Sequence, residues 1–452
     1  MSAPARQSLV IADVVETTRR LIRHDTTNPP GETAACTMWL RDQLSDAGLH
    51  TRVVSGDRDR PNLVARLEGR GEAPPLVLHA HTDVVPTAGQ PWSRPAFSGD
   101  LVPDGHGGQE IWGRGAVDMK GPLAMMTAAL HRLGSGQEPP AGDIVLAVVS
   151  DEEAGSTAGA SYLLREHPEL FDGARYAIGE EGGAGLDLDG TLRVHPVVVA
   201  EKRACWLRVT LRGPAGHGSR VAGADTAVRR LTRLLSALEP GGLPPVVTPV
   251  VERLLTALHS RLSGPAAAAC ARLREDPADP AALDALPARD AQYFRSVVRH
   301  SVNPTVLRGG VTTNVLPAEI TVELDGRLLP GPYPPERFVK DLSELVGFPL
   351  DAEVLVLGEE MPEPAFDGFY ETLAGILAEK DPGGVPVPMM TTASTDARLF
   401  ARLGITCFGW TPLLLPAGAP HRWLLHTPDE RVPVDALRFG ADCFETLLRR
   451  YR

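Results

Sequence analysis

Side chains that can bind metals or transfer protons gather in five short segments of this chain. Each segment combines histidine or carboxylate residues with glycines or a turn, and the five are LVLHAHTDVVP (76–86), IWGRGAVDMKGP (111–122), SDEEAGS (150–156), YAIGEEGG (176–183) and LLHTPDERV (424–432). Carboxylate oxygens mixed with imidazole nitrogens suit zinc, manganese or cobalt. Two metal ions that share one bridging carboxylate would use such a set economically.

The first segment places His79, His81 and Asp83 where an apolar strand runs out into a loop. Because side chains alternate along an extended chain, His81 and Asp83 face the same side. An aspartate in that position can accept the second imidazole N–H, which orients the ring and makes it a better metal ligand. A solvated loop histidine is the simpler interpretation of this segment taken alone.

Carboxylates dominate the second and third segments. Asp118 lies in a glycine-rich loop just before a predicted helix, where it either caps the helix or turn or binds a ligand. The acidic cluster 151–153 directly follows an apolar strand, at the end where open α/β sheets hold their ligands. Adjacent carboxylates repel each other unless a cation or proton neutralises them, so the cluster favours a metal, and a solvated acidic loop is the alternative.

The last two segments also place carboxylate or histidine side chains beside a strand end or a turn. An apolar strand ends in Glu180 and Glu181, and His426 stands beside a turn that carries Asp429 and Glu430. Neither segment is informative alone. Together with the others, they put candidate ligands mainly at the ends of predicted strands.

Apolar runs bounded by turn residues predict the strands that position these groups, at 61–67, 76–78 and 144–149. A helix over 122–133 separates the last two. Buried strands alternating with helices predict an α/β fold, with a mostly parallel sheet flanked by helices.

The pattern changes after Arg203. Leu207, Val209 and Leu211 alternate with polar residues, as in a half-exposed antiparallel strand, and 320–324 does the same. This predicts a separate α+β unit with an insertion at about 240–300, which includes a helix over 250–262. The chain then returns to the first domain through a helix near 367–379, a strand at 405–410 and a final helix at 434–450. The predicted domains are 1–202, 203–358 and 359–452, the first and last forming one body.

The amino-acid composition and net charge disfavour some classes of binding partner. The 452 residues are 43% hydrophobic and 23% charged, with 45 basic and 57 acidic side chains and a net charge of −12. This balance argues against nucleic acid as a partner and favours small molecules. The chain has no membrane-length apolar run and no apolar signal core, so we expect a cytoplasmic protein with no membrane partner. Its five scattered cysteines suggest neither disulfides nor a thiolate zinc site.

With HTDVVP, WGRGAVDMKG, DEEAGS and HTPDERV in this order, the chain resembles the M20 metallopeptidase family over nearly its whole length. The resemblance implies a di-metal catalytic domain and an inserted α+β lid, or dimerisation, domain. It also implies roles for individual residues. His81 and Glu180 would bind one metal, Asp118 would bridge both, and Glu153 and His426 would bind the second.

The resemblance further assigns Glu152 as general base and Asp83 as the carboxylate that orients His81. Relatives usually show a single acid before glycine or proline, so Glu181 is the alternative to Glu180. In the lid, the resemblance implies that His217 of GPAGHGS reaches a neighbouring subunit's site and stabilises an oxyanion. Three further residues would hold substrate, namely Asn314 of GGVTTNVLP, Arg327 of LDGRLLPG and Arg398 of TDARLF.

The order of segments is most similar to the aminoacylase and carboxypeptidase S branch of the family. That similarity implies a metal-dependent hydrolase that cleaves the amide bond of N-acyl amino acids or short peptides with a free carboxylate, through a metal-bridged water activated by Glu152. It implies two divalent metal ions, zinc by default with cobalt or manganese as alternatives, and a homodimer formed through the lid. A dipeptidase or carboxypeptidase, a pathway-specific deacylase and a non-catalytic binding relative remain alternatives.

Overall fold

The structure is a computed structural model that describes residues 10–105, 107–136, 138–188, 192–220, 223, 225–239, 242–364, 366–420 and 424–452. The chain forms two compact units. Unit 1 combines Met1–Val199, Ala365–Pro388 and Thr395–Arg452, and unit 2 combines Ala200–Pro364 with Met389–Ser394.

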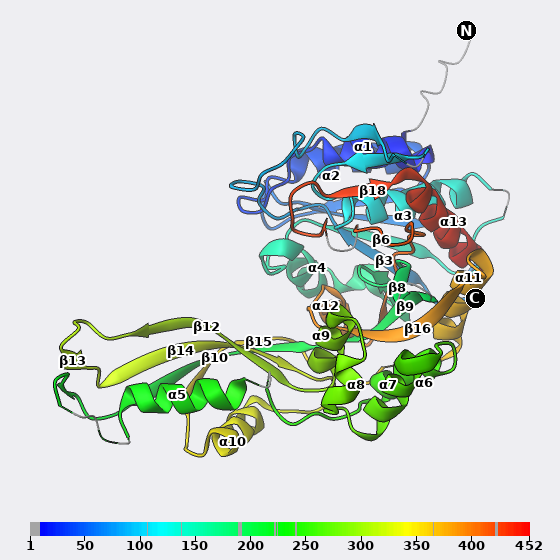
Figure 1. Cartoon of the computed structure of the whole chain (residues 1–452). Coiled ribbons are helices and arrows are strands. Elements are labelled where there is room, and N and C mark those ends of the chain that lie inside the picture. Colours follow the sequence, from blue (N-terminus) through cyan, green and yellow to red (C-terminus); the bar gives the residue numbers. More distant parts are fainter. Residues whose placement is uncertain are drawn as a thin grey trace, which may run out of the picture. The chain divides into compact units, whose positions relative to one another are not determined.

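A sheet of nine strands forms the centre of unit 1 (Figure 1). Eight of its strands follow one another in the order β1 (His50–Val54), β2 (Asn62–Leu67), β6 (Ile144–Val149), β3 (Leu76–His81), β7 (Tyr176–Gly179), β17 (Thr406–Gly409), β9 (Leu192–Glu201) and β16 (Gly384–Thr391), and β8 (Leu186–Leu188) pairs with β9. The central neighbours β6, β3, β7 and β17 are parallel, whereas the outer pairs whose direction is defined are antiparallel. This confirms the predicted α/β class.

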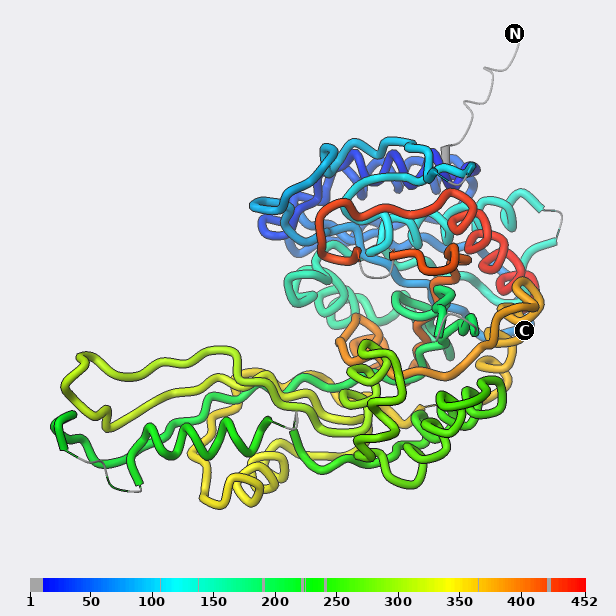
Figure 2. Tube along the Cα trace, in the orientation of Figure 1, coloured from blue at the N-terminus to red at the C-terminus, as the bar shows by residue number. Residues whose placement is uncertain are grey.

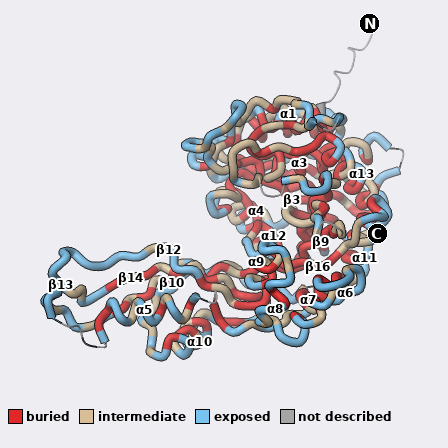
Figure 3. The backbone as a smooth tube through the Cα atoms, in the orientation of Figure 1, coloured by how far each residue is buried: buried red, intermediate tan, exposed pale blue. Residues whose placement is uncertain are grey.

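The central strands are buried on both faces, which explains their continuous apolar sequences. All six residues of β3 and of β6 are buried. One face packs against α3 (Lys120–Gly134), and the other carries Val77 and Val145 into a cluster with residues of α4 (Ala160–Glu166) and α12 (Ala397–Ala401). Figure 3 shows β3 and α3 in the buried interior of the unit.

Segments far apart in sequence complete unit 1. The helices α1 (Val14–Ile22) and α13 (Val434–Arg450) both pack on α3 and contact each other, so helices from the first and last parts of the described chain lie side by side (Figure 2). The remaining helices are α2 (Ala34–Asp46) and α11 (Gly368–Lys380), with short 3-10 turns at Val10–Ala12, Glu152–Ala154 and Pro168–Phe171. A small sheet joins β4 (Asp100–Pro103), β5 (Gln109–Trp112) and β18 (Arg431–Pro433).

Unit 2 contains an antiparallel sheet in the order β12 (Ser301–Gly309), β14 (Glu319–Leu328), β10 (Arg203–Arg212) and β15 (Asp351–Leu357). Every second residue of β14 is buried, as expected when one face of a sheet packs on helices. Those helices are α5 (Ala227–Leu238) and α10 (Pro335–Val346). A two-stranded ladder pairs β11 (Gly216–His217) with β13 (Val315–Leu316).

The region of the predicted insertion is helical. It contains α6 (Pro249–His259), α7 (Gly264–Glu275), α8 (Pro280–Asp284) and α9 (Ala288–Val297), which pack in sequence one on the next. The helix predicted over 250–262 corresponds to α6.

Two features differ from the sequence prediction. The strand predicted at 76–78 continues to His81, so His79 and His81 belong to β3 rather than to a loop. His79 is buried and stacks on Phe400 with ring centroids 4.7 Å apart, which makes it a core residue. The long strands β9 and β16 were not predicted at all.

Among the described residues, no helix has both the length and the apolar character needed to cross a bilayer. The cytoplasmic location and the exclusion of nucleic acid stay predictions from composition.

Candidate metal centre

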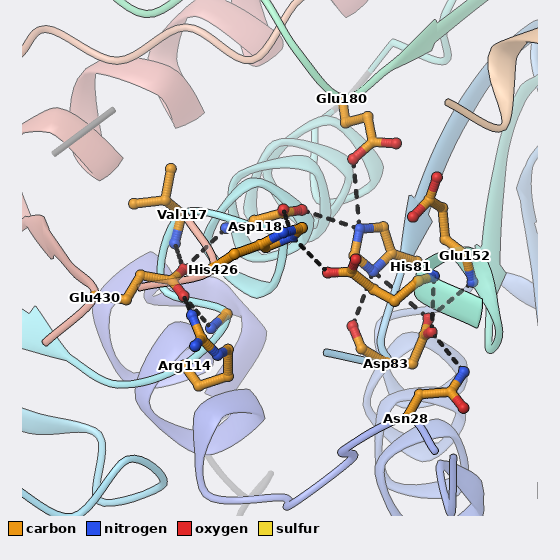
Figure 4. Close-up of polar contacts among 12 residues, drawn as sticks. Asn28, His81, Asp83, Arg114, Val117, Asp118, Glu152, Glu180, His426 and Glu430 are labelled. Atoms are coloured by element: carbon orange, nitrogen blue, oxygen red, sulfur yellow. Dashed lines mark hydrogen bonds and ion pairs between the residues drawn. The ribbon is translucent and has the colours of Figure 1, made fainter. Parts of the chain in front are cut away.

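His81 and Glu180 meet because their strands are neighbours in the parallel sheet. His81 ends β3 and Glu180 follows β7 directly, so both lie at the same edge of the sheet. His81 Nε2 lies 3.1 Å from Asp118 Oδ1 and 3.4 Å from Glu180 Oε2 (Figure 4). The three side chains form one group of candidate ligands.

Asp118 also belongs to a second group. Its other oxygen, Oδ2, lies 3.1 Å from His426 Nε2, and His426 Nε2 lies 3.3 Å from Glu153 Oε1. Glu153 stands in the short turn that follows β6, next to β3 in the sheet. Each Asp118 oxygen therefore faces a different histidine, which is the geometry of a bridging carboxylate.

The ligand atoms within each group all lie within 4.8 Å of one another. Around a tetrahedral zinc ion with ligands at about 2.0–2.2 Å, ligand atoms are roughly 3.4 Å apart. The observed separations of 3.1–3.4 Å match this spacing, so these residues fit two divalent cations. Glu180, and not Glu181, lies in the first group.

The ionisable side chains of the two groups shift one another's pKa values. Burial raises the pKa of Glu180 to about 7, although His81 opposes the shift. Burial also raises the pKa of Asp118, but hydrogen bonds from His426 and His81 outweigh it and hold that pKa below its usual range. Hydrogen bonds to Asp118 and Glu153 raise the pKa of His426 to about 10. Positive charge next to these buried carboxylates thus favours their ionised form, and a divalent cation would supply such charge.

Glu152 stands beside these groups but belongs to neither. Its carboxylate is turned toward the side of Glu180 in Figure 4. Burial, followed by the negative charges of Glu180 and Asp396, raises the pKa of Glu152 well above its ordinary value. A raised pKa suits a carboxylate that must accept a proton near neutral pH.

Asp83 follows β3 and connects it to the acidic turn. The acceptor nearest His81 Nδ1 is the main-chain oxygen of Asp83, at 2.9 Å, whereas its carboxylate Oδ1 is 3.6 Å away. The carboxylate instead accepts the main-chain N–H groups of Glu152 and Glu153, both at 3.1 Å. Asn28 donates its amide to Asp83 and to Asp151, both at 2.9 Å. Asp83 therefore positions the acidic turn as well as the imidazole.

Two of the predicted lid residues are neighbours in unit 2. His217 pairs with Val315 across the β11–β13 ladder, and the Asn314 carbonyl oxygen accepts the Gly218 N–H at 2.7 Å. The main-chain N–H of Ser219 points at His217 Nδ1 at 3.2 Å. In the neutral ring this hydrogen bond leaves the proton on Nε2, which makes Nε2 a donor.

The two predicted substrate-binding arginines already have protein partners. Arg327 donates to both oxygens of Asp325, at 2.7 and 3.2 Å, and stacks over Trp206. It lies eight residues along β14 from Glu319, roughly 26 Å from the end of the sheet next to β13. Arg398, on α12, donates to the Thr395 carbonyl oxygen.

The sequence patterns did not select several residues that surround this site. Asn28 and Gln90 lie outside the five segments, Arg114 lies inside the second segment but was not selected, and Glu430 was noted only as part of a turn. Their contacts join residues distant in sequence, so no local pattern could find them.

Comparisons with known proteins agree on one family. The sequence model described as Peptidase family M20/M25/M40 matches residues 77–450. Aminoacylase-1 of Sus scrofa is 28% identical over 450 residues, covering 95% of this chain and 93% of that protein.

Two solved structures share the fold. A M20 family metallo-carboxypeptidase from Sulfolobus solfataricus superposes with a TM-score of 0.67 at 16% identity, covering 97% of this chain and 99% of that one. A dinuclear metal binding peptidase of the M20 family from Bacillus subtilis gives a TM-score of 0.55 at 14% identity, covering 96% of both chains.

Proposed function

This chain belongs to peptidase family M20/M25/M40 and is a metal-binding hydrolase of amide or peptide bonds, and from that premise we propose that it cleaves N-acyl amino acids or short peptides with a free carboxylate. The observation that carries the proposal is the pair of ligand groups that share Asp118, with the Glu152 carboxylate beside them and bound to neither. The likeness to aminoacylase-1 over 95% of the chain supports the N-acyl amino acid class.

In this proposal His81, Asp118 and Glu180 hold one cation, and Asp118, Glu153 and His426 hold the other. Two divalent ions would lower the pKa of a water molecule and polarise the substrate carbonyl group. Zinc suits the ligand set, and cobalt or manganese would also fit it.

Glu152 acts as the general base. Its carboxylate takes the proton of the attacking water and delivers it to the leaving amine as the C–N bond breaks, so the residue returns to its starting state. The Asp83 carboxylate accepts hydrogen bonds from the main chain of Glu152 and Glu153. These bonds fix the position of the base relative to the neighbouring ligand Glu153.

His217 stabilises the developing oxyanion, and unit 2 serves as lid and dimerisation domain. The Nε2 donor left by the Ser219 hydrogen bond supports this role. Asn314 lies next to β13, beyond the Glu319 end of β14, whereas Arg327 lies near the other end of β14, and this separation supports a homodimer in which one end serves the partner's site. The edge strand β15, with exposed Val354 and Val356, offers a surface for the second copy. We propose that Asn314, Arg327 and Arg398 contact the substrate.

A substrate panel tests the proposed function. Zinc-loaded protein is incubated with N-acetyl amino acids, long-chain acyl amino acids and dipeptides, and amine release is measured. Release from acyl amino acids supports the proposal, whereas release only from dipeptides selects the dipeptidase or carboxypeptidase alternative. No release while two metal ions are bound would contradict the proposal and leave a narrow pathway deacylase or a binding relative.

We expect His217→Ala to lower kcat while the metal content stays unchanged, because His217 lies in neither ligand group. Removal of one oxyanion donor typically costs about 10²–10³ in kcat. Turnover and metal content by elemental analysis are the measurements. Loss of metal from this variant would assign His217 to the metal centre instead.

Mixing two inactive variants tests the partner's contribution. After dissociation and reassociation of equal amounts of His217→Ala and Glu152→Gln, half of the dimers are mixed, and each carries one site with both residues. Activity should recover to about a quarter of the wild-type value. Activity no higher than that of the separate variants would place His217 in its own subunit's site.

A further inference from the structure

Glu430 is a fully buried carboxylate that belongs to neither ligand group. Its Oε1 accepts the main-chain N–H groups of Val117 and Asp118 at 2.8 and 3.1 Å, and its Oε2 accepts that of Gly115 at 3.1 Å (Figure 4). Three main-chain N–H groups in the loop that carries Asp118 therefore donate to the single side chain of Glu430.

Arg114 extends this arrangement. The side chain is 1% exposed, and its guanidinium donates to Glu430 Oε2 at 2.7 Å and to Gln90 Oε1 at 2.8 Å. Gln90 in turn donates its amide to the main-chain oxygen of His426 at 2.9 Å. A continuous series of hydrogen bonds thus runs from the Asp118 N–H, through Glu430, Arg114 and Gln90, to the His426 carbonyl.

His426 needs such a restraint. Its φ angle of 59° lies in the left-handed region, which is unfavourable for a residue with a side chain, and its side chain is 53% exposed. Packing alone therefore does not hold this residue. In contrast, His81 ends a buried central strand and needs no comparable support.

Stability is a poor explanation for the buried pair of Arg114 and Glu430. Removing two charges from water offsets most of the attraction between them, so such pairs contribute little net stability. Their value here is geometric, because they join two loops whose ligands are 308 residues apart in sequence.

We propose that Gln90, Arg114 and Glu430 form a clamp that positions Asp118 and His426 for the second cation. This inference rests on the proposed function, because it assumes that both ligand groups bind metal. Gln90 is the part of the clamp that contacts the His426 main chain, so its loss should weaken the second site and spare the first.

The test uses Gln90→Ala and Gln90→Glu, with Gln292→Ala on the exposed face of α9 as the matched control. The glutamate variant keeps an acceptor for Arg114 but loses the donor to His426. Metal-free proteins are titrated with Co²⁺, and the two sites are followed by visible absorption. Outer partners of metal ligands typically contribute about 10–100-fold in affinity.

Both Gln90 variants should weaken the second Co²⁺ site by about 10–100-fold with the first site and the metal-free unfolding temperature unchanged, whereas Gln292→Ala should match the wild type. Unchanged affinity at both sites, or equal weakening of both with a lower unfolding temperature, overturns the clamp. If the wild-type protein binds fewer than two Co²⁺ ions, the proposed metal pair is wrong and the clamp fails with it. If the wild type binds two ions and the Gln90 variants bind them equally well, only the clamp is wrong.

Discussion

Glu152→Gln should abolish most of the hydrolytic activity and leave both metal ions in place. The substitution preserves the shape of the side chain but removes its ability to accept a proton, and general bases typically contribute about 10²–10⁴-fold in rate. Because the Glu152 side chain belongs to neither ligand group, no metal ligand is lost. The measurements are kcat/KM on the best substrate of the panel and metal content by elemental analysis.

The matched control is Glu166→Gln, which makes the same change on an exposed side chain at the end of α4. It should behave as the wild type. A Glu152→Gln protein with a nearly normal rate would exclude Glu152 as the base, and loss of one metal ion would show that its carboxylate is a ligand.

Asp118→Ala should remove both metal ions and with them all measurable activity. Each carboxylate oxygen faces a different histidine, at 3.1 Å in both cases, so one substitution takes a ligand from each group. Two of the three ligands remain in each group, which are too few to hold a catalytic cation tightly, since such sites commonly use three protein ligands. Metal content after dialysis and residual amine release are the measurements.

His426→Ala provides the informative comparison, because His426 contacts only the second group. It should lose one metal ion where Asp118→Ala loses two. The control is Asp42→Ala on the exposed surface of α2, which should keep both ions. Retention of two ions by the Asp118→Ala protein would contradict the bridging role.

Local sequence patterns were sufficient for several of the strands and helices and for the nomination of the site. The apolar run predicted as a strand at 144–149 is β6, and the final helix predicted at 434–450 is α13. The spacing of apolar residues that marks a strand or a helix can be recognised from residues close together in sequence. For this reason the local patterns located these two elements. The roles of individual site residues and the domain limits stay predictions.

The tertiary structure decided what depends on distant partners. β9 and β16 were not predicted, and His81 proved to end a strand that continues further than its apolar run. The choice between Glu180 and Glu181 as neighbour of His81 also depends on how β7 packs beside β3.

The resemblance of the sequence motifs to the M20 family was enough to predict a two-metal amide hydrolase in which Asp118 is the shared ligand. They could not reveal that the Asp83 carboxylate holds the acidic turn, or that Glu430 holds the Asp118 loop. Asp118 lies 37 residues from His81 and 308 from His426, yet 3.1 Å from each ring. Such distances are set by the burial of the whole sheet and its helices, which no local pattern contains.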